Sequence, residues 1–230
     1  MEHLAIIPAR SGSKGLKDKN IKCLQGKPLL AYSISAAIES GVFSEVMVST
    51  DSTVYAKVAE EYGASVPFLR SEATSGDMAG SWDAVKEVLH EYLIRGKRFD
   101  TVCLLQPTSP LRNAQDILNG YNELYERDAD AITAVCEVEH SPLWSMTLEE
   151  DHSLTNFRKC MLSVPRQKLT TYYRLNGALY IRRIAYRTNE IALLDRKEYA
   201  YIMDRQRSID IDSIEDFAYA SFMMTYLQGK

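Results

Sequence analysis

The feature that most constrains the fold is a regular alternation of strand-like and helix-like segments in the first 138 residues. Four short runs rich in apolar and β-branched residues end in polar loops, at residues 4–7, 46–49, 101–105 and 131–138. The segments between them have apolar residues at helical spacing. Strands that alternate with helices of this length predict βαβ units and a mostly parallel sheet flanked by helices. Ligands of such sheets bind beyond the carboxyl ends of the strands.

Three of the helical segments have clear ends or clear apolar stripes. The first begins at Pro28 and ends at Gly41, with Leu30 and Ile34 on its apolar face. The second has its stripe within residues 82–93. The third begins at the N-cap Asn113 and has its stripe within residues 117–125.

The alternation stops at residue 139 and returns at residue 178. No clean period is present from 139 to about 175, so we expect an inserted arm there. Further strands are predicted at 178–181, 199–203 and 208–212. Without repeats or a flexible linker, the chain is predicted to form one domain over residues 1–230 with an arm at 139–175.

A last helix is predicted to begin after the N-cap Ser213. Its sequence suggests four inward-facing side chains, which are Ile214, Phe217, Ala218 and Met224.

Composition excludes several classes of protein. Hydrophobic residues make up 46% of the chain and charged residues 25%, as in ordinary globular proteins. The formal net charge of −4 argues against a general nucleic-acid binder. No apolar run approaches the ~20 residues of a membrane span, and the sequence begins without a basic leader. The four cysteines are scattered, so we expect reduced thiols in a cytoplasmic protein. From the charge and the apolar runs, we expect it to bind neither nucleic acid nor a membrane.

A basic, glycine-containing loop at residues 9–20 follows the first predicted strand. It holds four basic side chains and one acidic one, and Gly12 and Gly15 allow the backbone to approach a ligand closely. The loop has neither the Walker A spacing nor the Gly-x-Gly-x-x-Gly spacing. A solvated flexible loop is the alternative, but the position after a strand favours a polyphosphate site.

Two acids, Asp210 and Asp212, lie at the end of the last predicted strand, residues 208–212. Strand alternation would place both carboxylates on one face and Ile209 and Ile211 on the core face. Two neighbouring carboxylates suit a hard cation such as Mg²⁺ held together with phosphate oxygens. The alternative is two exposed acids favoured by the positive end of the next helix.

Two further segments carry polar groups at predicted strand ends. Residues 105–112 include Gln106, which could bind a sugar or a base, within a stiff turn containing two prolines. Residues 48–52 end in Ser52, which we expect to cap the next helix. Arg166 and Arg174 lie in and after the irregular region, where a guanidinium suits a carboxylate ligand.

Taken together, these motifs resemble the acylneuraminate cytidylyltransferases, the CMP-sialic acid synthetases. The matches are in chain order and spread over nearly the whole sequence. They are Ile6-Ile7-Pro8-Ala9-Arg10-x-Gly12-Ser13-Lys14-Gly15 with Lys19-Asn20, then Val48-Ser49-Thr50-Asp51, residues 105–112, Pro165-Arg166-Gln167, Arg174-x-Asn176-Gly177-Ala178-x-Tyr180-Ile181 and residues 208–212.

The resemblance implies a Rossmann-like nucleotidyltransferase fold with a small dimerisation arm, and therefore a homodimer. It also implies that CTP and a nonulosonic acid react to give the CMP-sugar and pyrophosphate. By matching position, it assigns nucleotide binding to Arg10, Ser13, Lys14, Lys19, Asn20 and Ser81. It assigns the sugar pocket to Gln106, Arg166, Arg174 and Tyr180, and Mg²⁺ to Asp210 and Asp212. From the charge that must be stabilised on the phosphates, we expect Arg10 and Lys19 to act in catalysis alongside the two acids.

One position departs from the family pattern. The family often has two phenylalanines against the sugar where this chain has Leu193 and Leu194. Leucines keep the wall apolar but remove ring stacking. The sugar therefore stays open among N-acetylneuraminate, legionaminate, pseudaminate and 3-deoxy-manno-octulosonate, and GTP stays open beside CTP. A nucleotide-binding sensor without catalysis is the alternative from another class.

Overall fold

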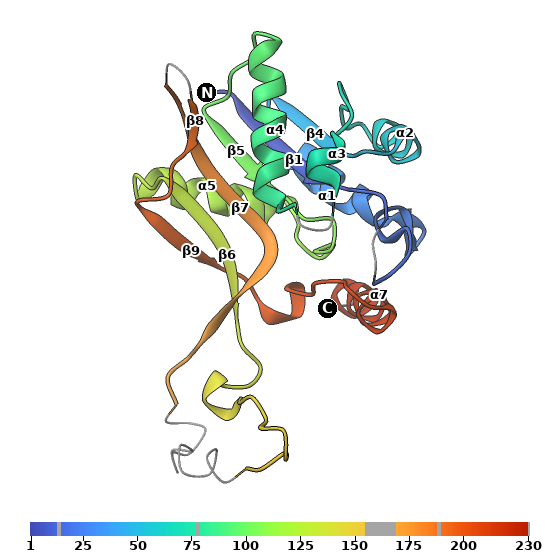
Figure 1. Cartoon of the computed structure of the whole chain (residues 1–230), viewed down its shortest axis with the longest axis vertical. Coiled ribbons are helices and arrows are strands. Elements are labelled where there is room, and N and C mark those ends of the chain that lie inside the picture. The colour runs from blue at the N-terminus through green and yellow to red at the C-terminus, as the bar shows by residue number, and fades with distance from the viewer. Residues whose placement is uncertain (13–14, 77–78, 155–168, 188–189, 230) are drawn as a thin grey trace.

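The computed structural model describes residues 1–12, 15–76, 79–154, 169–187 and 190–229. It contains a seven-stranded sheet in the order β4-β1-β5-β7-β6-β9, with β8 paired to β7 (Figure 1). The strands are β1 (His3–Pro8), β4 (Glu45–Ser49), β5 (Thr101–Leu104), β6 (Ala131–Glu137), β7 (Tyr173–Arg187), β8 (Glu190–Leu193) and β9 (Glu198–Ile202). The pairs β1–β4, β1–β5 and β6–β9 are parallel, whereas β7 runs antiparallel to β5, β6 and β8. Only β7 runs against the common direction of the other six strands in this sheet, so the predicted mostly parallel sheet is confirmed.

The helices begin and end close to the predicted positions. They are α1 (Leu29–Ser40), α2 (Thr53–Glu61), α3 (Glu72–Ser75), α4 (Ser81–Ile94), α5 (Ala114–Glu126) and α7 (Ile214–Gln228). Pro28 and Gly41 flank α1, and Gly41 has the left-handed conformation, with φ 63°, that glycine adopts without strain. The Asn113 side chain accepts a hydrogen bond from the Asp116 N–H, and Ser52 caps α2 in the same way through Tyr55. No helix among the described residues is both long and apolar enough to cross a membrane.

Helices cover both faces of the sheet (Figure 1). Ala5 and Ile7 of β1 face the cluster that holds α1 and α5, and Leu4 and Ile6 face the cluster that holds α4. This alternation follows from the two-residue period of a strand. All four side chains are fully buried. Burial of each large apolar side chain stabilises the fold by about 1.5–3 kcal/mol, which fixes the strand ends that carry the loops.

The predicted strand at 208–212 is not a strand in the structure. A short 3-10 turn at Arg205–Arg207 precedes it, and the Ile211 N–H donates to the Thr108 carbonyl at 2.9 Å. Ile209 and Ile211 are nevertheless buried against α7, and Asp210 and Asp212 point away from that core. The alternation of side chains was therefore right, although the hydrogen bond goes to a turn rather than to a strand ladder.

The inward face of α7 is partly different from the prediction. Phe217 and Met224 are buried as expected, but Ile214 is 52% exposed and Ala218 is exposed. Ala220 and Met223 occupy the buried stripe, which the helical period places on the side of Phe217 and Met224.

The chain from residue 139 onward leaves the body of the domain between β6 and β7. These strands stay paired as far as Glu137 and Tyr173, and the Val138 N–H donates to the Tyr172 carbonyl at 3.0 Å. The described residues 139–154 and 169–172 extend away from the sheet (Figure 1). The arm predicted at 139–175 thus overlaps the start of β7 by three residues, 173–175.

Candidate active site

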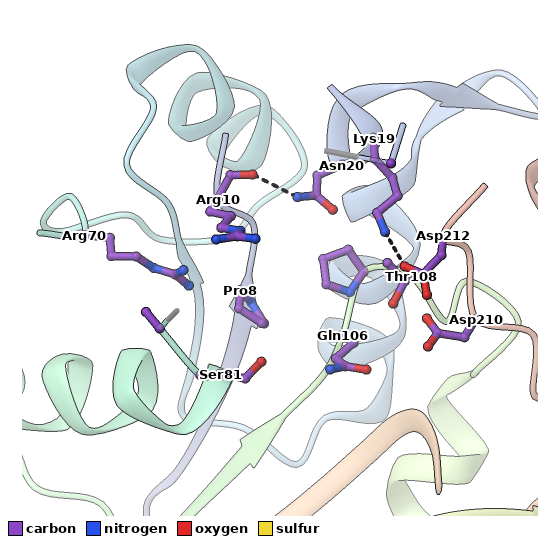
Figure 2. Close-up of a pocket in the computed structure, with 14 residues that line it drawn as sticks. Pro8, Arg10, Lys19, Asn20, Arg70, Ser81, Gln106, Thr108, Asp210 and Asp212 are labelled. Atoms are coloured by element: carbon purple, nitrogen blue, oxygen red, sulfur yellow. Dashed lines mark hydrogen bonds and ion pairs between the residues drawn. The ribbon is translucent and has the colours of Figure 1, made fainter. Parts of the chain in front are cut away.

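A cavity of about 630 Å³ opens beyond the carboxyl ends of β1 and β5 (Figure 2). Its walls come from the loop after β1, the start of α4, the turn after β5 and the segment before α7. The lining residues are Pro8, Arg10, Gly15, Lys19, Asn20, Arg70, Ala79, Gly80, Ser81, Gln106, Pro107, Thr108, Asp210 and Asp212. Of the predicted site residues, the structure therefore brings Arg10, Lys19, Asn20, Ser81, Gln106, Asp210 and Asp212 into one cavity.

Asp51 holds the start of the basic loop in place. Its carboxylate accepts hydrogen bonds from the Ser11 N–H at 2.7 Å and the Ser11 hydroxyl at 2.8 Å. Gly12 follows with a positive φ of 77°, which favours glycine. At Gly15 a Cβ would lie 2.7 Å from the Asp212 carbonyl oxygen, so a side chain would separate the loop from the acid segment. The predicted nucleotide ligands Ser13 and Lys14 lie outside the described residues.

Arg10 and Asn20 lie side by side at the top of the cavity. The Asn20 amide donates to the Arg10 carbonyl at 3.2 Å, and Nη1 of Arg10 donates to the Gly76 carbonyl at 2.7 Å. Figure 2 shows the Arg10 guanidinium on the same side of the cavity as Ser81, the first residue of α4. This arrangement provides cationic and backbone N–H groups for an anionic ligand.

Arg70 lies in the same cavity and has no counterpart in the sequence prediction. Its Nε donates to the Ser49 hydroxyl at 3.0 Å, and its Nη2 donates to the Ser49 carbonyl at 3.3 Å. Burial lowers the pKa of Arg70, and the Asp51 carboxylate opposes that shift. Arg70 lies outside every described strand and helix. It is held at the cavity by contacts with residues 49 and 50, which are distant in the sequence.

Lys19 bridges the basic loop and the acid pair. Its Nζ lies 2.9 Å from Oδ1 of Asp212 and donates to the Ile211 carbonyl at 2.7 Å. The Lys19 side chain is 12% exposed and that of Asp212 is 79% exposed. The ammonium is therefore held at the edge of the cavity while the carboxylate stays accessible to a ligand.

Asp210 lies beside Asp212 and is exposed, although neighbouring groups displace part of its water. Desolvation raises the pKa of Asp210, the Asp212 charge raises it further, and a hydrogen bond from Thr108 opposes both effects. The two carboxylates therefore repel each other in the absence of a cation. Oxygen-only donors beside a basic loop fit Mg²⁺, an ion that commonly completes its coordination with water and phosphate oxygens. The described residues contain no group of three or more side chains that could hold a metal ion without such ligands.

The predicted sugar-binding residues are divided among neighbouring hollows. Gln106 lines the main cavity, and a Cβ at Gly177 would lie 2.2 Å from its Oε1, so β7 approaches Gln106 closely. Arg174 lines a second hollow that shares Asp210 and Asp212, and its Nη2 donates to the Ser208 carbonyl at 3.0 Å.

Tyr180 and Leu193 lie on the α4 side of the sheet. The Tyr180 ring packs edge-on against Trp82, with 6.1 Å between ring centroids, in an apolar hollow that also contains Leu175. Leu193 lines an adjoining hollow with Trp82, and Leu194 is half-buried. The structure does not place these three residues in the main cavity, and Arg166 lies outside the described residues. Trp82 has a wall position that the sequence prediction missed.

We expect Asp51→Ala to lower the free energy of unfolding by about 1–2 kcal/mol near neutral pH, because it removes two hydrogen bonds to a charged group. Burial alone would raise the pKa of Asp51, but the hydrogen bonds from Ser11 lower it below its ordinary value of 3.8. The carboxylate therefore contributes stability above about pH 4, and this contribution is lost as the pH falls through the folded-state pKa. Urea unfolding at about pH 7 and pH 3 should show the difference from the unmodified protein shrinking at the lower pH. Ser11→Ala should give a smaller loss, and a difference that grows at acid pH would contradict this role.

The family model described as Cytidylyltransferase matches residues 4–230. The chain belongs to the cytidylyltransferase family. The resemblance read from the motifs is thereby confirmed.

Curated relatives of this chain differ in the sugar acid that they are named for. N-acylneuraminate cytidylyltransferases from Escherichia coli and Streptococcus agalactiae are 38% and 37% identical over 94% of the chain. The chain spans about half of their length, 51% and 52% respectively. A pseudaminic acid cytidylyltransferase from Campylobacter jejuni is 32% identical and covered over 96% of its length. A CMP-N,N'-diacetyllegionaminic acid synthase from Legionella pneumophila is 34% identical and covered over 97% of its length.

Solved structures share the fold of this chain at low sequence identity. A CMP:2-keto-3-deoxy-manno-octonic acid synthetase in complex with CTP matches with a TM-score of 0.70 at 15% identity, over 98% of this chain and 99% of the other. A 4-diphosphocytidyl-2C-methyl-D-erythritol synthase from Anaerococcus prevotii matches with a TM-score of 0.62 at 14% identity, over 99% and 98%. The nucleotidyltransferase fold predicted from the motifs is therefore confirmed.

Proposed function

We propose that this cytidylyltransferase transfers CMP from CTP to the anomeric 2-hydroxyl of a nonulosonic acid and releases pyrophosphate. The observation that carries the proposal is the single cavity in which Arg10 and Lys19 of the basic loop face Gln106, Asp210 and Asp212 (Figure 2). Cations for a polyphosphate, acids for a metal and an amide for a sugar are the groups that this reaction needs.

The nucleotide half of the cavity is assigned to the basic loop and the start of α4. Arg10, Lys19, Asn20 and Ser81 line it, and Ser13 and Lys14 complete the set by sequence position. Arg70 adds a second guanidinium on the same side of the cavity as Ser81 (Figure 2). The names of the relatives and the CTP in one structural neighbour favour CTP over GTP.

Asp210 and Asp212 are the residues that would hold Mg²⁺. When bound there, the ion would neutralise charge on the phosphates and lower the pKa of a coordinated hydroxyl. Lys19 forms a 2.9 Å contact with Asp212, and Thr108 forms a hydrogen bond with Asp210. A cation held jointly by the two carboxylates and by phosphate oxygens would relieve the repulsion between the carboxylates.

Charge stabilisation then falls to the side chains around the phosphates. The attack of the sugar hydroxyl on the α-phosphate forms one P–O bond and breaks the bond to the β-phosphate oxygen. Arg10 and Lys19 are placed to stabilise negative charge on the α-phosphate and on departing pyrophosphate. No histidine or cysteine lines the described part of the cavity, and its two carboxylates are the groups that would hold Mg²⁺. A metal-activated hydroxyl would not need a separate general base.

The sugar acid would extend from Gln106 along the α4 side of the sheet. Gln106 can hydrogen-bond the sugar, and Arg174 or Arg166 can pair with its carboxylate. Tyr180, Leu193 and Leu194 would form the apolar wall. Relatives covered over nearly their whole length are named for pseudaminic and legionaminic acids, which favours a sialic-type acid other than N-acetylneuraminate. A homodimer held by the arm belongs to the same proposal, and the mass of the protein in solution tests it.

The test is pyrophosphate release with CTP, Mg²⁺ and each of four acids, which are N-acetylneuraminate, legionaminate, pseudaminate and 3-deoxy-manno-octulosonate. We expect rapid release with one sialic-type acid, little with the octulosonate, and little when GTP replaces CTP. If no acid in the panel gives pyrophosphate release while CTP still binds, the result would support a nucleotide sensor. Preference for the octulosonate would contradict the proposed substrate class.

A further inference from the structure

Arg112 is a charged side chain buried beneath the floor of the cavity. It is 2% exposed, and it follows the turn after β5. Among the described residues it forms no ion pair. Two of its nitrogens donate to neutral oxygens: Nε to the Ala178 carbonyl at 2.9 Å, and Nη2 to the Ser33 hydroxyl at 2.6 Å and the Gln106 carbonyl at 3.2 Å. The third nitrogen, Nη1, is buried without a hydrogen-bond partner among the described residues. Burial lowers the pKa of Arg112 to about 10, so the guanidinium stays charged near neutral pH.

The two carbonyl oxygens that Arg112 binds, those of Gln106 and Ala178, belong to backbone outside the regular strand pairing. β5 ends at Leu104, before Gln106. Pairing between β6 and β7 lapses between Tyr180 and Leu175, where β7 advances by five residues while β6 advances by two, from Thr133 to Val135. Ala178 lies inside that irregular stretch. Buried carbonyls without a strand partner need another donor, and one guanidinium provides several in a fixed fork.

These contacts set the position of Gln106. Its carbonyl is bound by Arg112 and, at 3.3 Å, by the Ser33 hydroxyl of α1. Its side-chain oxygen lies against Gly177, the residue before Ala178. Arg112 therefore fixes both the backbone from which the Gln106 side chain extends and the strand against which that side chain rests.

A buried polar network of Ser33, Ser109, Arg112, Asn176 and Ser208 extends the same connection toward the acid pair. Each of its side chains is at most 2% exposed. Ser109 donates to the Asn176 carbonyl at 3.2 Å, and the Asn176 amide donates to Ser208 at 2.9 Å, two residues before Asp210. The network thus joins α1, the turn after β5, β7 and the segment before α7.

We propose that Arg112 is a positioning residue that holds Gln106, and with it the sugar-acid half of the cavity, in the reactive arrangement. The proposal rests on the proposed function for its kinetic consequence. It predicts that the CTP half, which α4 and the loop after β1 build, does not depend on Arg112. A lysine cannot replace the guanidinium, because one ammonium cannot reach oxygens on α1, β7 and the turn at the same time.

We expect Arg112→Lys to lower kcat/KM for the sugar acid by about 10- to 100-fold, since small displacements of a positioning group cost this much. The dissociation constant for CTP, measured by calorimetry, should change by less than about threefold. Arg183→Lys is the matched control, because Nε of Arg183 also donates to a backbone carbonyl, that of Ala129 at 2.7 Å, away from the cavity lining. In a Gln106→Ala background, Arg112→Lys should have little further effect on kcat/KM. Both changes remove the contact between a correctly placed Gln106 side chain and the sugar acid.

Hydrogen–deuterium exchange tests the physical basis whether or not turnover is found. In Arg112→Lys, the amides of Ser109, Ala178 and Ile211 should exchange faster, and in Arg183→Lys they should not. If Arg112→Lys fails to fold, Ser33→Ala removes one of its partners and should give the same pattern with a smaller, about two- to fivefold, kinetic effect. Unchanged exchange at these amides, or equal losses of CTP binding and sugar-acid turnover, would overturn the proposal. Silence of the unmodified protein with every sugar acid would instead refute the proposed function, and exchange would still decide the role of Arg112.

Discussion

Asp212→Ala is expected to lower magnesium-dependent pyrophosphate release by about 100- to 1000-fold, the loss seen when a charge-stabilising group is removed from a reaction site. The carboxylate lines the cavity, its side chain is 79% exposed, and it lies beside Asp210 at the edge of the basic loop. Loss of one of two acids should weaken Mg²⁺ binding, so the Mg²⁺ concentration for half-maximal rate should rise. Because the side chain is exposed, the melting temperature should change little.

Asp128→Ala is the matched control for this prediction. Asp128 forms a 3.0 Å contact with Lys197, and its side chain is 83% exposed, so the pair resembles Asp212 and Lys19 in geometry but lies outside the cavity lining. Turnover by Asp128→Ala should equal that of the unmodified protein. Full activity of Asp212→Ala, or an equal loss in both variants, would remove the basis for placing Mg²⁺ at the acid pair.

Lys19→Met is expected to lower kcat by about 100-fold while leaving the apparent affinity for Mg²⁺ equal or tighter. In the part of the chain that the structure describes, Lys19 is the basic residue that forms an ion pair with Asp212, and we place its ammonium on the phosphates in the reaction. Its removal takes away positive charge from the phosphates, but it also removes a charge that competes with a cation for Asp212. Methionine retains the apolar stem of a side chain that is only 12% exposed, so the fold should be kept.

The two variants at the bridge therefore separate two roles. Asp212→Ala should change the Mg²⁺ dependence, and Lys19→Met should change the rate at saturating Mg²⁺. Lys197→Met is the control for the second, because Lys197 makes a contact of similar length with Asp128 away from the cavity, although its side chain is 57% exposed. If Lys19→Met instead required more Mg²⁺, Lys19 would serve to organise the acids rather than to stabilise the phosphates.

The sequence predicted the sheet and its helices well because local signals and burial agree there. Pro28 and Gly41 mark the ends of α1, and Asn113 marks the start of α5, through caps that depend only on neighbouring residues. The cavity residues Arg10, Lys19 and Gln106 could be predicted because they follow β1 and β5, whose carboxyl ends meet at one edge.

Residues positioned by distant contacts could not be predicted in this way. Arg70 reaches the cavity through Ser49, and Arg112 reaches Ala178 across a strand irregularity. Neither contact leaves a periodic or spacing signal. The segment at 208–212 has the alternation of a strand, but its Ile211 N–H binds a turn instead of a neighbouring strand, a choice that depends on the tertiary fold.

The most direct test of the proposed chemistry follows the oxygen atom of the sugar hydroxyl that attacks the α-phosphate. The sugar acid that is most active in the substrate panel would be labelled with ¹⁸O at its anomeric hydroxyl, and the products with CTP and Mg²⁺ would be analysed by mass spectrometry. Attack of that hydroxyl on the α-phosphate predicts a CMP-sugar that retains the label and pyrophosphate that contains none. Formation of free CMP with the sugar acid unchanged, or of labelled pyrophosphate, would contradict the account.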